Sequence, residues 1–354
     1  MMNSMKNYFR QLADTRDNGV SAKPLAPALN AASSVYGTAV KNVRGLYEKK
    51  LLKRRRLPFP VISVGNITWG GTGKTPLVEY LARRVSEHNR NVLILTRGYS
   101  QDEISQMQHH LPRIKIGVGK NRFETAQKIA ASEKIDIAIL DDGFQHWALE
   151  RDLEIVTVNA LNPFGNGKLL PRGILREPMD VLKRANIIVV THANLVTTQE
   201  LEKLKNQMKG IAPAAEVAES YLEPLFFYRA QKRGRLGIER LAKQRVTTFS
   251  GVGYPRSFQL LLSRCQIKPV RNFEFADHHV FTEKELQEVR EMSISASTEE
   301  IITTEKDFFR SPDMISRILN PLVLATRLRF LRGEEMVNRN LIRVLGVPVH
   351  ERSR

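Results

Sequence analysis

Short runs of apolar residues recur through residues 57–200, and amphipathic segments separate them. The runs predict strands at 60–65, 91–96, 114–118, 135–140, 153–158 and 187–190. Between them, apolar residues return at the spacing of a helix in 76–85, 102–110 and 122–131. Strands that are apolar on both faces are typical of parallel sheets covered by helices, so this region predicts a parallel α/β domain.

A second, smaller series of the same kind follows. It predicts strands at 246–250, 268–273, 300–304 and 323–325, with helices at 257–263 and 282–291. We therefore expect a first α/β domain over 57–200, a linker with a strand at 224–228 over 201–245, a smaller α/β domain over 246–335 and a tail over 336–354. The cleft between two such domains is a natural ligand site.

The start of the chain has a different pattern. Residues 1–25 predict a variable leader, and residues 26–56 predict a basic amphipathic helix whose apolar side includes Leu29, Tyr36 and Val43. No run reaches the roughly 18–20 apolar residues needed to span a bilayer, which favours a helix that lies at a membrane surface. A helix packed on its own domain is the alternative.

Basic residues concentrate in the same region. The chain carries a net charge of +18, and residues 1–56 contribute 12 Lys/Arg against 3 Asp/Glu, a net +9. The densest run, over 49–56, suits an anionic membrane surface, where each basic residue is worth about 1 kcal/mol, although nucleic acid and plain solvation also fit. The single cysteine, Cys265, excludes an intrachain disulfide and indicates a reducing compartment.

Residues 60–76, PVISVGNITWGGTGKTP, join a buried strand to a glycine-rich turn and a helix, which is typical of a nucleotide triphosphate site. Backbone N–H groups and a lysine would hold the phosphates of ATP, and a threonine hydroxyl would bind Mg²⁺. The expected binding residues are Gly70, Gly71, Thr72, Gly73, Lys74 and Thr75. Thr68 stands where the usual pattern has its first glycine, and a tight turn without a ligand is the alternative.

Two carboxylates, Asp141 and Asp142, end the strand predicted at 135–140 and predict a Mg²⁺ site that complements the phosphate loop. The next loop brings Gln145 and His146, and His146 either contacts substrate or braces the loop.

Two further loops carry candidate residues. The irregular loop 162–178 offers Lys168, Arg172 and Arg176 as positive charges for a phosphorylated substrate, with surface solubility as the alternative. In the second domain, the sequence Asp277-His278-His279 is a candidate for proton handling.

Taken together, these stretches resemble the tetraacyldisaccharide 4′-kinases, the lipid A 4′-kinase family. The matching stretches, in family order, are PVISVGNITWGGTGKTP (60–76), LTRGY (95–99), ILDDGFQH (139–146), RDLEI (151–155), FGNGKLLPRGILREP (164–178), FSGVG (249–253), FADH (275–278) and TTEKD (303–307). The resemblance runs from about residue 26 to residue 330, and the first, third and fifth stretches together are specific for this family.

The resemblance implies Mg²⁺- and ATP-dependent transfer of the γ-phosphoryl group to the 4′-hydroxyl of a tetraacyldisaccharide 1-phosphate, which gives lipid IVA. It also implies a two-lobed P-loop NTPase-like α/β fold with a membrane-associated N-terminal helix. An Asp–His pair of the family assists deprotonation of the acceptor hydroxyl, and it maps here to Asp102 and His278. Asp102, oriented or assisted by His278, is then expected to take the proton. The stretch around Asp102 departs from the family's Gly-Asp-Glu-Pro at Gln101 and Ile104. The residues expected at the substrate are Gln145, His146, Lys168, Arg172 and Arg176.

Other functions stay open at this point. A GTPase would need a guanine-specifying motif near residues 191–194, but Thr-His-Ala-Asn lacks its lysine and acid. A nucleic-acid-dependent ATPase would spread its charge along a groove, whereas half of the excess lies at the N-terminus, so no nucleic-acid partner is expected. A non-catalytic, membrane-bound nucleotide-binding protein fits the altered stretch around Asp102. The leader and the shortened stretch after Tyr99 favour a mitochondrial location over the cytoplasmic face of a bacterial inner membrane.

Overall fold

The computed structural model describes residues 26–98, 101–230 and 232–346, which form two compact units. The smaller unit contains residues 101–109 and 222–329, and the larger unit contains the rest of the described chain. The chain leaves the larger unit within β7 (Glu216–Arg229) and returns to it within β12 (Leu322–Arg332). The leader expected over 1–25 lies outside the described residues.

The larger unit is built on a parallel sheet with the strand order β7-β6-β5-β1-β4-β2-β3. In addition to β7, its strands are β1 (Val61–Gly65), β2 (Val92–Thr96), β3 (Lys115–Val118), β4 (Ile137–Asp141), β5 (Leu153–Asn159) and β6 (Ile187–Thr191). The central strands β1, β4, β5 and β6 are buried along their whole length. Burial on both faces explains why the sequence shows them as continuous apolar runs.

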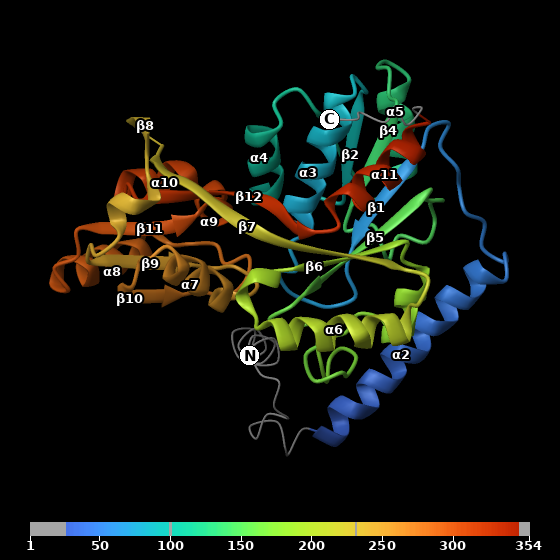
Figure 1. Cartoon of the computed structure of the whole chain (residues 1–354), viewed down its shortest axis with the longest axis horizontal. Helices are drawn as coiled ribbons and strands as arrows, with labels where there is room; N and C mark the ends of the chain where they lie inside the picture. The colour runs from blue at the N-terminus through green and yellow to red at the C-terminus, as the bar shows by residue number, and fades with distance from the viewer. Residues whose placement is uncertain (1–25, 99–100, 231, 347–354) are drawn as a thin grey trace. The chain divides into compact units, whose positions relative to one another are not determined.

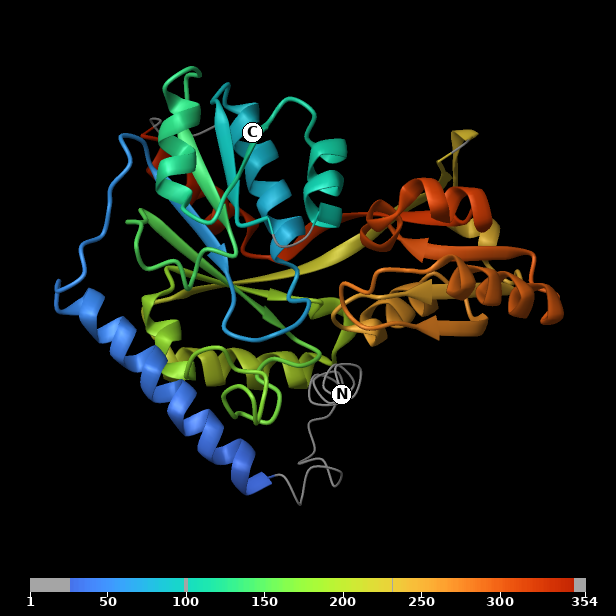
Figure 2. The ribbon, with the colours of Figure 1, turned by 180° about the vertical axis from the view of Figure 1, so that it is seen from behind.

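Helices lie on both sides of this sheet (Figures 1 and 2). They are α2 (Ala26–Glu48), α3 (Lys74–Glu87), α5 (Arg122–Ala130), α6 (Thr198–Ile211) and α11 (Glu334–Leu345), with the short 3-10 helices η2 (Met179–Arg184) and η3 (Ala193–Leu195). α6 begins at a capping box made by Thr197 and Glu200, which satisfies N–H groups of its first turn. Its apolar side packs in one cluster with Val156 and Val158 of β5.

The smaller unit has the parallel strand order β10-β9-β11-β12, and β8 pairs antiparallel with β7. Its further strands are β8 (Lys232–Leu236), β9 (Val246–Ser250), β10 (Pro269–Glu274) and β11 (Glu300–Thr304). Its helices are α7 (Pro255–Arg264), α8 (Glu283–Ser295), α9 (Glu305–Arg310), α10 (Pro312–Ile318), the short η4 (Ile238–Leu241) and most of α4 (Gln101–His110). Two apolar clusters fill it, one around Phe227 and Leu262 and one around Phe249 and Phe308.

The predicted fold class, a parallel α/β sheet with a second α/β unit, is confirmed, but the boundaries differ from those expected. The linker expected over 201–245 contains most of α6 and all of β7 and β8, because these residues pair with sheet strands or pack on them. Residues 334–345 form α11 where a tail was expected; Val337 and Leu341 are buried, and glycines in the left-handed region flank the helix. Residues 101–109, expected in the first domain, cluster with the smaller unit.

The N-terminal helix is shorter than the expected 26–56, because α2 ends at Glu48. Beyond it, the backbone N–H of Arg55 donates to the Ala148 carbonyl, and Arg55 forms a parallel β-bridge with Leu149. These contacts hold the segment in an extended conformation. One side of α2 contacts the loop that precedes η2: the Ser33 hydroxyl donates to the Leu169 carbonyl at 3.0 Å. Part of α2 therefore packs on its own domain, as the alternative in the sequence predicted.

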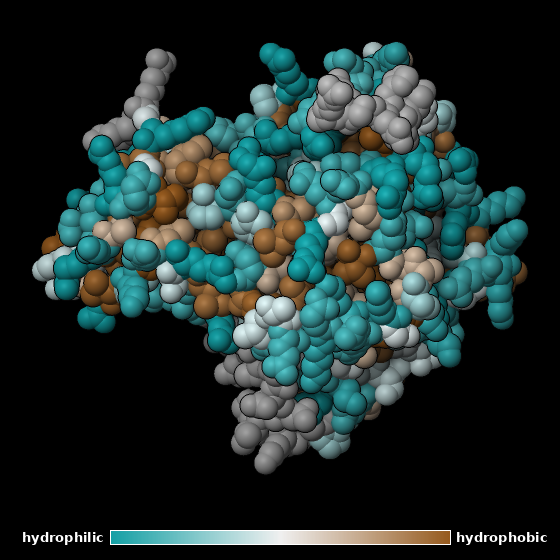
Figure 3. All heavy atoms as spheres, in the orientation of Figure 1, coloured by the Kyte–Doolittle hydropathy of each residue, from teal (hydrophilic) through white to brown (hydrophobic). Residues whose placement is uncertain are grey.

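Exposed residues are mostly hydrophilic on the face shown in Figure 3, in keeping with the charge of the chain. Apolar residues are nevertheless exposed in and just after α2; they are Val35, Val43, Leu46, Leu51 and Leu52. None of the helices in the described part of the chain is both long enough and apolar enough to cross a membrane.

Candidate active site

The glycine-rich loop between β1 and α3 has the backbone form that phosphate binding requires. Gly70 and Gly73 lie at φ 106° and 76°, in the left-handed region that side chains disfavour. Gly73 is the N-cap of α3 and provides no side-chain cap, so the first N–H groups of the helix are left for another acceptor. A helix N-terminus of this kind attracts anions through its N–H groups and its dipole.

Side chains from the neighbouring strands fix the shape of this loop. The buried Thr72 hydroxyl lies 2.9 Å from the Thr157 hydroxyl and accepts from Asn66 Nδ2 at 2.9 Å. The Thr191 hydroxyl donates to the Thr72 carbonyl at 3.0 Å, and Asn159 Nδ2 donates to the Gly71 carbonyl at 3.3 Å. Thr72, expected as a nucleotide ligand, therefore uses its hydroxyl to hold the loop.

The carboxylates expected to bind Mg²⁺ lie beside this loop. β4 pairs with β1 in a register that sets Asp141 next to Val64, so Asp141 and Asp142 emerge at the edge where β1 enters the loop. Asp142 Oδ1 lies 3.6 Å from Lys74 Nζ and accepts from Arg176 Nη1 at 2.9 Å. Burial opposes ionisation of Asp142, but Lys74 and Arg176 outweigh it and lower its pKa to about 2.

The donor set fits Mg²⁺. Thr75, Asp141 and Asp142 supply only oxygen ligands, which Mg²⁺ prefers. No group of three or more His, Cys, Asp and Glu within the described ranges forms a complete metal cage. A site with few carboxylates is the usual one for Mg²⁺ that is bound together with nucleotide phosphates.

The loop 162–178 is tied to the phosphate loop through side chains and backbone. Arg176 Nη1 donates to Asn66 Oδ1 at 3.2 Å, and its backbone N–H donates to the Ile67 carbonyl at 2.7 Å. Gln145 Nε2 donates to the Asn66 carbonyl at 2.8 Å and to the buried Glu177 carboxylate at 2.9 Å. Arg176 and Gln145, both expected at the substrate, thus connect the two loops.

The other expected substrate residues of the larger unit have different surroundings. His146 has a pKa lowered to about 4 because burial and then the charges of Arg122 and Arg151 disfavour its cation. Lys168 is exposed. Arg172 is half-buried, and its backbone N–H donates to the Ser33 hydroxyl of α2 at 3.0 Å.

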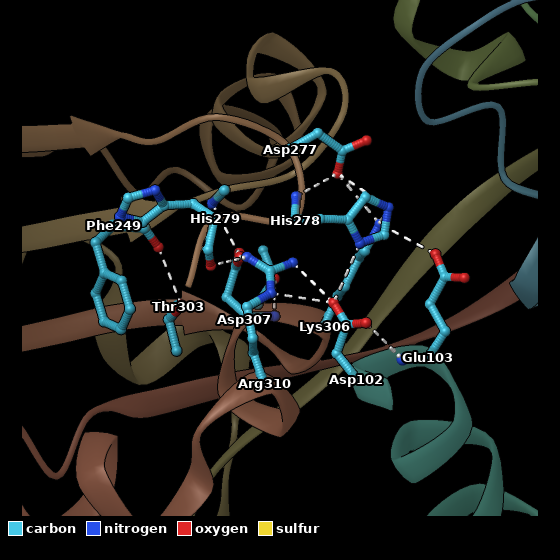
Figure 4. Close-up of polar contacts among 12 residues, drawn as sticks. Asp102, Glu103, Phe249, Asp277, His278, His279, Thr303, Lys306, Asp307 and Arg310 are labelled. Atoms are coloured by element: carbon cyan, nitrogen blue, oxygen red, sulfur yellow. Dashed lines mark hydrogen bonds and ion pairs between the residues drawn. The ribbon is translucent and has the colours of Figure 1, made fainter. Parts of the chain in front are cut away.

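The second expected group, Asp102 and His278, lies in the smaller unit (Figure 4). Asp102 stands in the first turn of α4, and His278 occupies the loop after β10 with φ 55°. The structure brings them together, with His278 Nδ1 3.6 Å from Asp102 Oδ2. The carboxylate is 4% exposed and the imidazole is 44% exposed, so the histidine is the more accessible of the two.

Asp102 is held by Arg310 at the end of α9. Arg310 Nε and Nη2 donate to Asp102 Oδ2 at 3.1 and 2.8 Å, and the backbone N–H of Glu103 donates to Oδ1 at 3.0 Å. Burial opposes ionisation of Asp102, yet His278 and Arg310 outweigh it and hold its pKa well below the usual range. Asp102 is thus a fixed anion whose two oxygens are already engaged.

Arg310 is itself positioned by a buried carboxylate that sequence reasoning missed. Asp307 Oδ1 accepts from Arg310 Nη1 at 3.1 Å and from the Gly251 N–H at 2.9 Å, and the Thr304 hydroxyl donates to Oδ2 at 2.7 Å. These contacts connect the TTEKD and FSGVG stretches of the sequence. The sequence signal for this carboxylate was the charged TTEKD stretch after a strand. It could not reveal the contact with Gly251, which lies far away in the sequence.

Comparison with known proteins identifies the family of this chain. The sequence model of the tetraacyldisaccharide-1-P 4′-kinases, LpxK, matches residues 25–345. The probable mitochondrial tetraacyldisaccharide 4′-kinase of Arabidopsis thaliana is 38% identical, covering 89% of each chain, and the tetraacyldisaccharide 4′-kinase of Halothermothrix orenii is 30% identical, covering 90% of this chain and 92% of its own. The structure of Aquifex aeolicus LpxK in complex with ATP is similar with a TM-score of 0.69 and 26% identity over 91% of this chain and 99% of that one. This chain is therefore a member of the tetraacyldisaccharide-1-P 4′-kinase family.

Proposed function

We propose that this protein transfers the γ-phosphoryl group of ATP to the 4′-hydroxyl of a tetraacyldisaccharide 1-phosphate and so forms lipid IVA. The observation that carries the proposal is the ion cluster of Lys74, Asp142 and Arg176 beside a glycine loop that ends in a helix N-terminus. Membership of a kinase family and the likeness to a structure in complex with ATP support it.

In this proposal the larger unit holds the phosphate donor. Backbone N–H groups of residues 70–74 and the Lys74 ammonium bind the phosphates, and Thr75, Asp141 and Asp142 hold Mg²⁺. When bound, Mg²⁺ neutralises negative charge on the phosphate oxygens. Arg176 keeps Asp142 ionised and provides a further positive charge for the γ-phosphoryl group or a phosphorylated acceptor.

Asp102 and His278 of the smaller unit handle the proton of the acceptor hydroxyl. Because Asp102 is buried and bonded to Arg310, it orients the imidazole, and the more exposed His278 meets the hydroxyl. This ordering inverts the expectation that Asp102 itself takes the proton. We propose that the reaction uses both groups of residues.

The test is phosphate transfer from labelled ATP to a purified tetraacyldisaccharide 1-phosphate. We expect Lys74→Ala to lower turnover by about 10²–10³, because the lysine charge that stabilises the transferred phosphoryl group is lost. Asp102→Ala and His278→Ala should each lower it by about 10²–10⁴. Lys128→Ala, an exposed lysine of α5, is the matched control and should behave as wild type.

Wild-type turnover in Lys74→Ala would contradict the assignment of the phosphate loop. ATP or GTP hydrolysis without transfer to the acceptor would favour a P-loop ATPase or GTPase, and nucleotide binding without either reaction would favour a non-catalytic protein. Hydrolysis stimulated by DNA or RNA would contradict our expectation that nucleic acid is not a partner.

We also propose that α2 and the segment after it attach the protein to an anionic membrane surface. All basic residues of the run over 49–56 are exposed. Arg55 and Arg56 form ion pairs with Glu124, Glu150 and Asp152, and Lys49, Lys50 and Lys53 stand at the start of the run. These lysines lie close in sequence to the exposed Leu51 and Leu52, a combination suited to an interface with lipid. The mitochondrial name of the Arabidopsis relative supports a mitochondrial location, which fluorescence of a tagged full-length chain would test.

A further inference from the structure

Two cations on α9 face the Asp102–His278 pair. Lys306 and Arg310 stand one helical turn apart, and Figure 4 shows both side chains directed at this pair. Arg310 takes Asp102 Oδ2, as described above. Lys306 is the second cation, and the roles described so far for the phosphate loop and the Asp–His pair do not include it.

The Lys306 ammonium makes three contacts. Nζ lies 3.1 Å from Glu103 Oε1, 3.3 Å from Asp277 Oδ1 and 3.4 Å from His278 Nε2. Burial disfavours the charge, but Asp277, Glu103 and Asp102 outweigh it and raise the pKa of Lys306 above its ordinary value. Lys306 therefore stays an ammonium, which donates hydrogen bonds and cannot accept one.

This contact decides which nitrogen of His278 carries the proton. Because an ammonium only donates, Nε2 must present its lone pair to Lys306. The ring proton then belongs on Nδ1, which lies 3.6 Å from the Asp102 carboxylate. Nε2 also lies 3.7 Å from Asp277 Oδ1, but that oxygen already accepts from Lys306, so the contact with the ammonium favours the Nδ1–H tautomer.

The surrounding charges are compatible with this form. The groups facing the ring are Asp102 and Glu103 from α4, Asp277 from its own loop, and Lys306 and Arg310 from α9. Glu103 and Asp277 both bind Lys306, and Asp102 binds Arg310. Asp307 is turned to Gly251, Thr304 and Arg310. Each carboxylate near the imidazole is therefore shared with a cation.

We propose that Lys306 is a positioning residue that holds His278 as the Nδ1–H tautomer, so that the Nε2 lone pair can accept the proton of the acceptor hydroxyl. The inference rests on the proposed function. In the reaction, the acceptor hydroxyl takes the place of Lys306 at Nε2, and Lys306 keeps Glu103 and Asp277. The hydroxyl proton passes to Nε2, the oxygen lone pair forms the bond to the γ-phosphorus, and the bond to the bridging oxygen breaks, so that ADP leaves with its electron pair.

The tautomer can be measured without any reaction. In the full chain labelled with ¹⁵N-histidine, with His278→Gln used to assign the signal, wild type should show an unprotonated Nε2 and a protonated Nδ1 near pH 7. Lys306→Met removes the charge at similar volume and should increase the imidazolium fraction, because a neighbouring positive charge disfavours that form. Lys306→Arg should keep the wild-type pattern. A proton on Nε2 of the wild-type ring would overturn the proposal.

Kinetics give the second readout. In Lys306→Met, the acidic limb of the profile of kcat/KM against pH should shift to a pH about one unit higher than in wild type. Turnover at pH 7 should be about 10–100-fold lower. Lys306→Arg should return the limb towards its wild-type position. Lys284→Met, an exposed lysine of α8, is the matched control. An unchanged profile in Lys306→Met would overturn the proposal.

The two proposals fail in different ways. If wild type transfers no phosphate to the glycolipid, the proposed function fails, while the ¹⁵N spectra still decide the role of Lys306. If wild type is active but Lys306→Met alters neither the tautomer nor the pH profile, only the inference about Lys306 fails. Should Lys306→Met not fold, the wild-type spectra and the Lys306→Arg profile remain decisive.

Discussion

Burial determines the protonation of single residues in this protein as much as their chemical type does. His192 follows β6 directly, with its backbone in the left-handed region at φ 56° and 8% of the residue exposed. Its Nδ1 has no hydrogen-bond partner within the structure. Burial alone lowers its pKa to about 4 from 6.5, so the ring is neutral at physiological pH. His192 is thus a buried residue that resists protonation.

This burial predicts a loss of stability in acid. A group whose folded-state pKa lies below its unfolded value stabilises the fold above pH 6.5, and this stabilisation is lost as the pH falls towards 4. The free energy of unfolding should fall by about 2–3 kcal/mol between pH 7.5 and 4.5 on account of His192. Urea unfolding at both pH values measures this, and His192→Asn, which tolerates the same backbone form, should remove the share of the loss that His192 causes.

The control for this prediction is His88→Asn, which alters an exposed histidine at the end of α3. That variant should keep the full acid-dependent loss. Part of the loss will persist in His192→Asn as well, because the pKa of His146 is also lowered to about 4. An equal pH dependence in wild type and His192→Asn would contradict the argument.

At the scale of elements, α2 and the loop before η2 depend on each other. The Ser33 hydroxyl donates to the Leu169 carbonyl and accepts from the Arg172 N–H, and the Tyr36 hydroxyl donates to the Arg176 carbonyl at 2.9 Å. Gly37 allows the close approach, because a Cβ there would lie 2.6 Å from Leu169 Cδ1. The same loop is bonded to the phosphate loop through Arg176, so α2 helps to place the residues around Asp142.

Ser33→Ala tests this coupling. The substitution leaves the half-buried Arg172 N–H without its acceptor and removes one of two donors from the Leu169 carbonyl, which keeps the Gly173 N–H; the cost is about 1–3 kcal/mol. Hydrogen exchange of residues 168–176 should become faster, with little change in the strands of the sheet. Ser34→Ala is the matched control, since its hydroxyl is exposed and only donates to Asn30 within the helix. Equal exchange in the two variants would show that α2 does not support the loop.

At the scale of the whole molecule, charge and hydropathy point to the N-terminal region. A net +9 of the total +18 lies in residues 1–56, and the exposed lysines after α2 stand among exposed leucines. Two arginines of the same run, Arg55 and Arg56, form ion pairs with carboxylates of the larger unit, whereas Arg54 lies over the Trp147 ring. The structure thus divides a basic run that looks uniform in sequence.

The vesicle experiment belongs to this scale. Replacing Lys49, Lys50 and Lys53 together by alanine should weaken binding to vesicles of anionic lipid by roughly 100-fold, since each basic residue near such a surface is worth about 1 kcal/mol. Sedimentation with vesicles measures it, and added salt should weaken wild-type binding in the same direction. The control triple replaces exposed lysines elsewhere, Lys128, Lys203 and Lys209. Binding that is equal for both triples would contradict the proposed surface.

Local patterns predicted most of the strands and helices, because their signals are local. β1, β4, β5 and β6 are continuous apolar runs, and the glycine loop has its chemistry in consecutive residues. Predictions were weaker where pairing extends an element beyond its apolar run: β7 begins at Glu216 and β12 continues to Arg332, with half-buried and exposed residues along both. Pairing with neighbouring strands, and not hydropathy, keeps the ends of β7 and β12 in strand conformation.

The sequence by itself determined the fold class, the family and the phosphate loop, since each depends on neighbouring residues or on short stretches in a fixed order. Only the tertiary structure decided that Arg310 binds Asp102, that Lys306 contacts His278 Nε2, and that the Thr72 hydroxyl stabilises its own loop. The physical reason is that protonation and hydrogen bonding depend on charges within a few ångströms, and α4, α9 and the loop after β10 bring those charges together from distant parts of the chain.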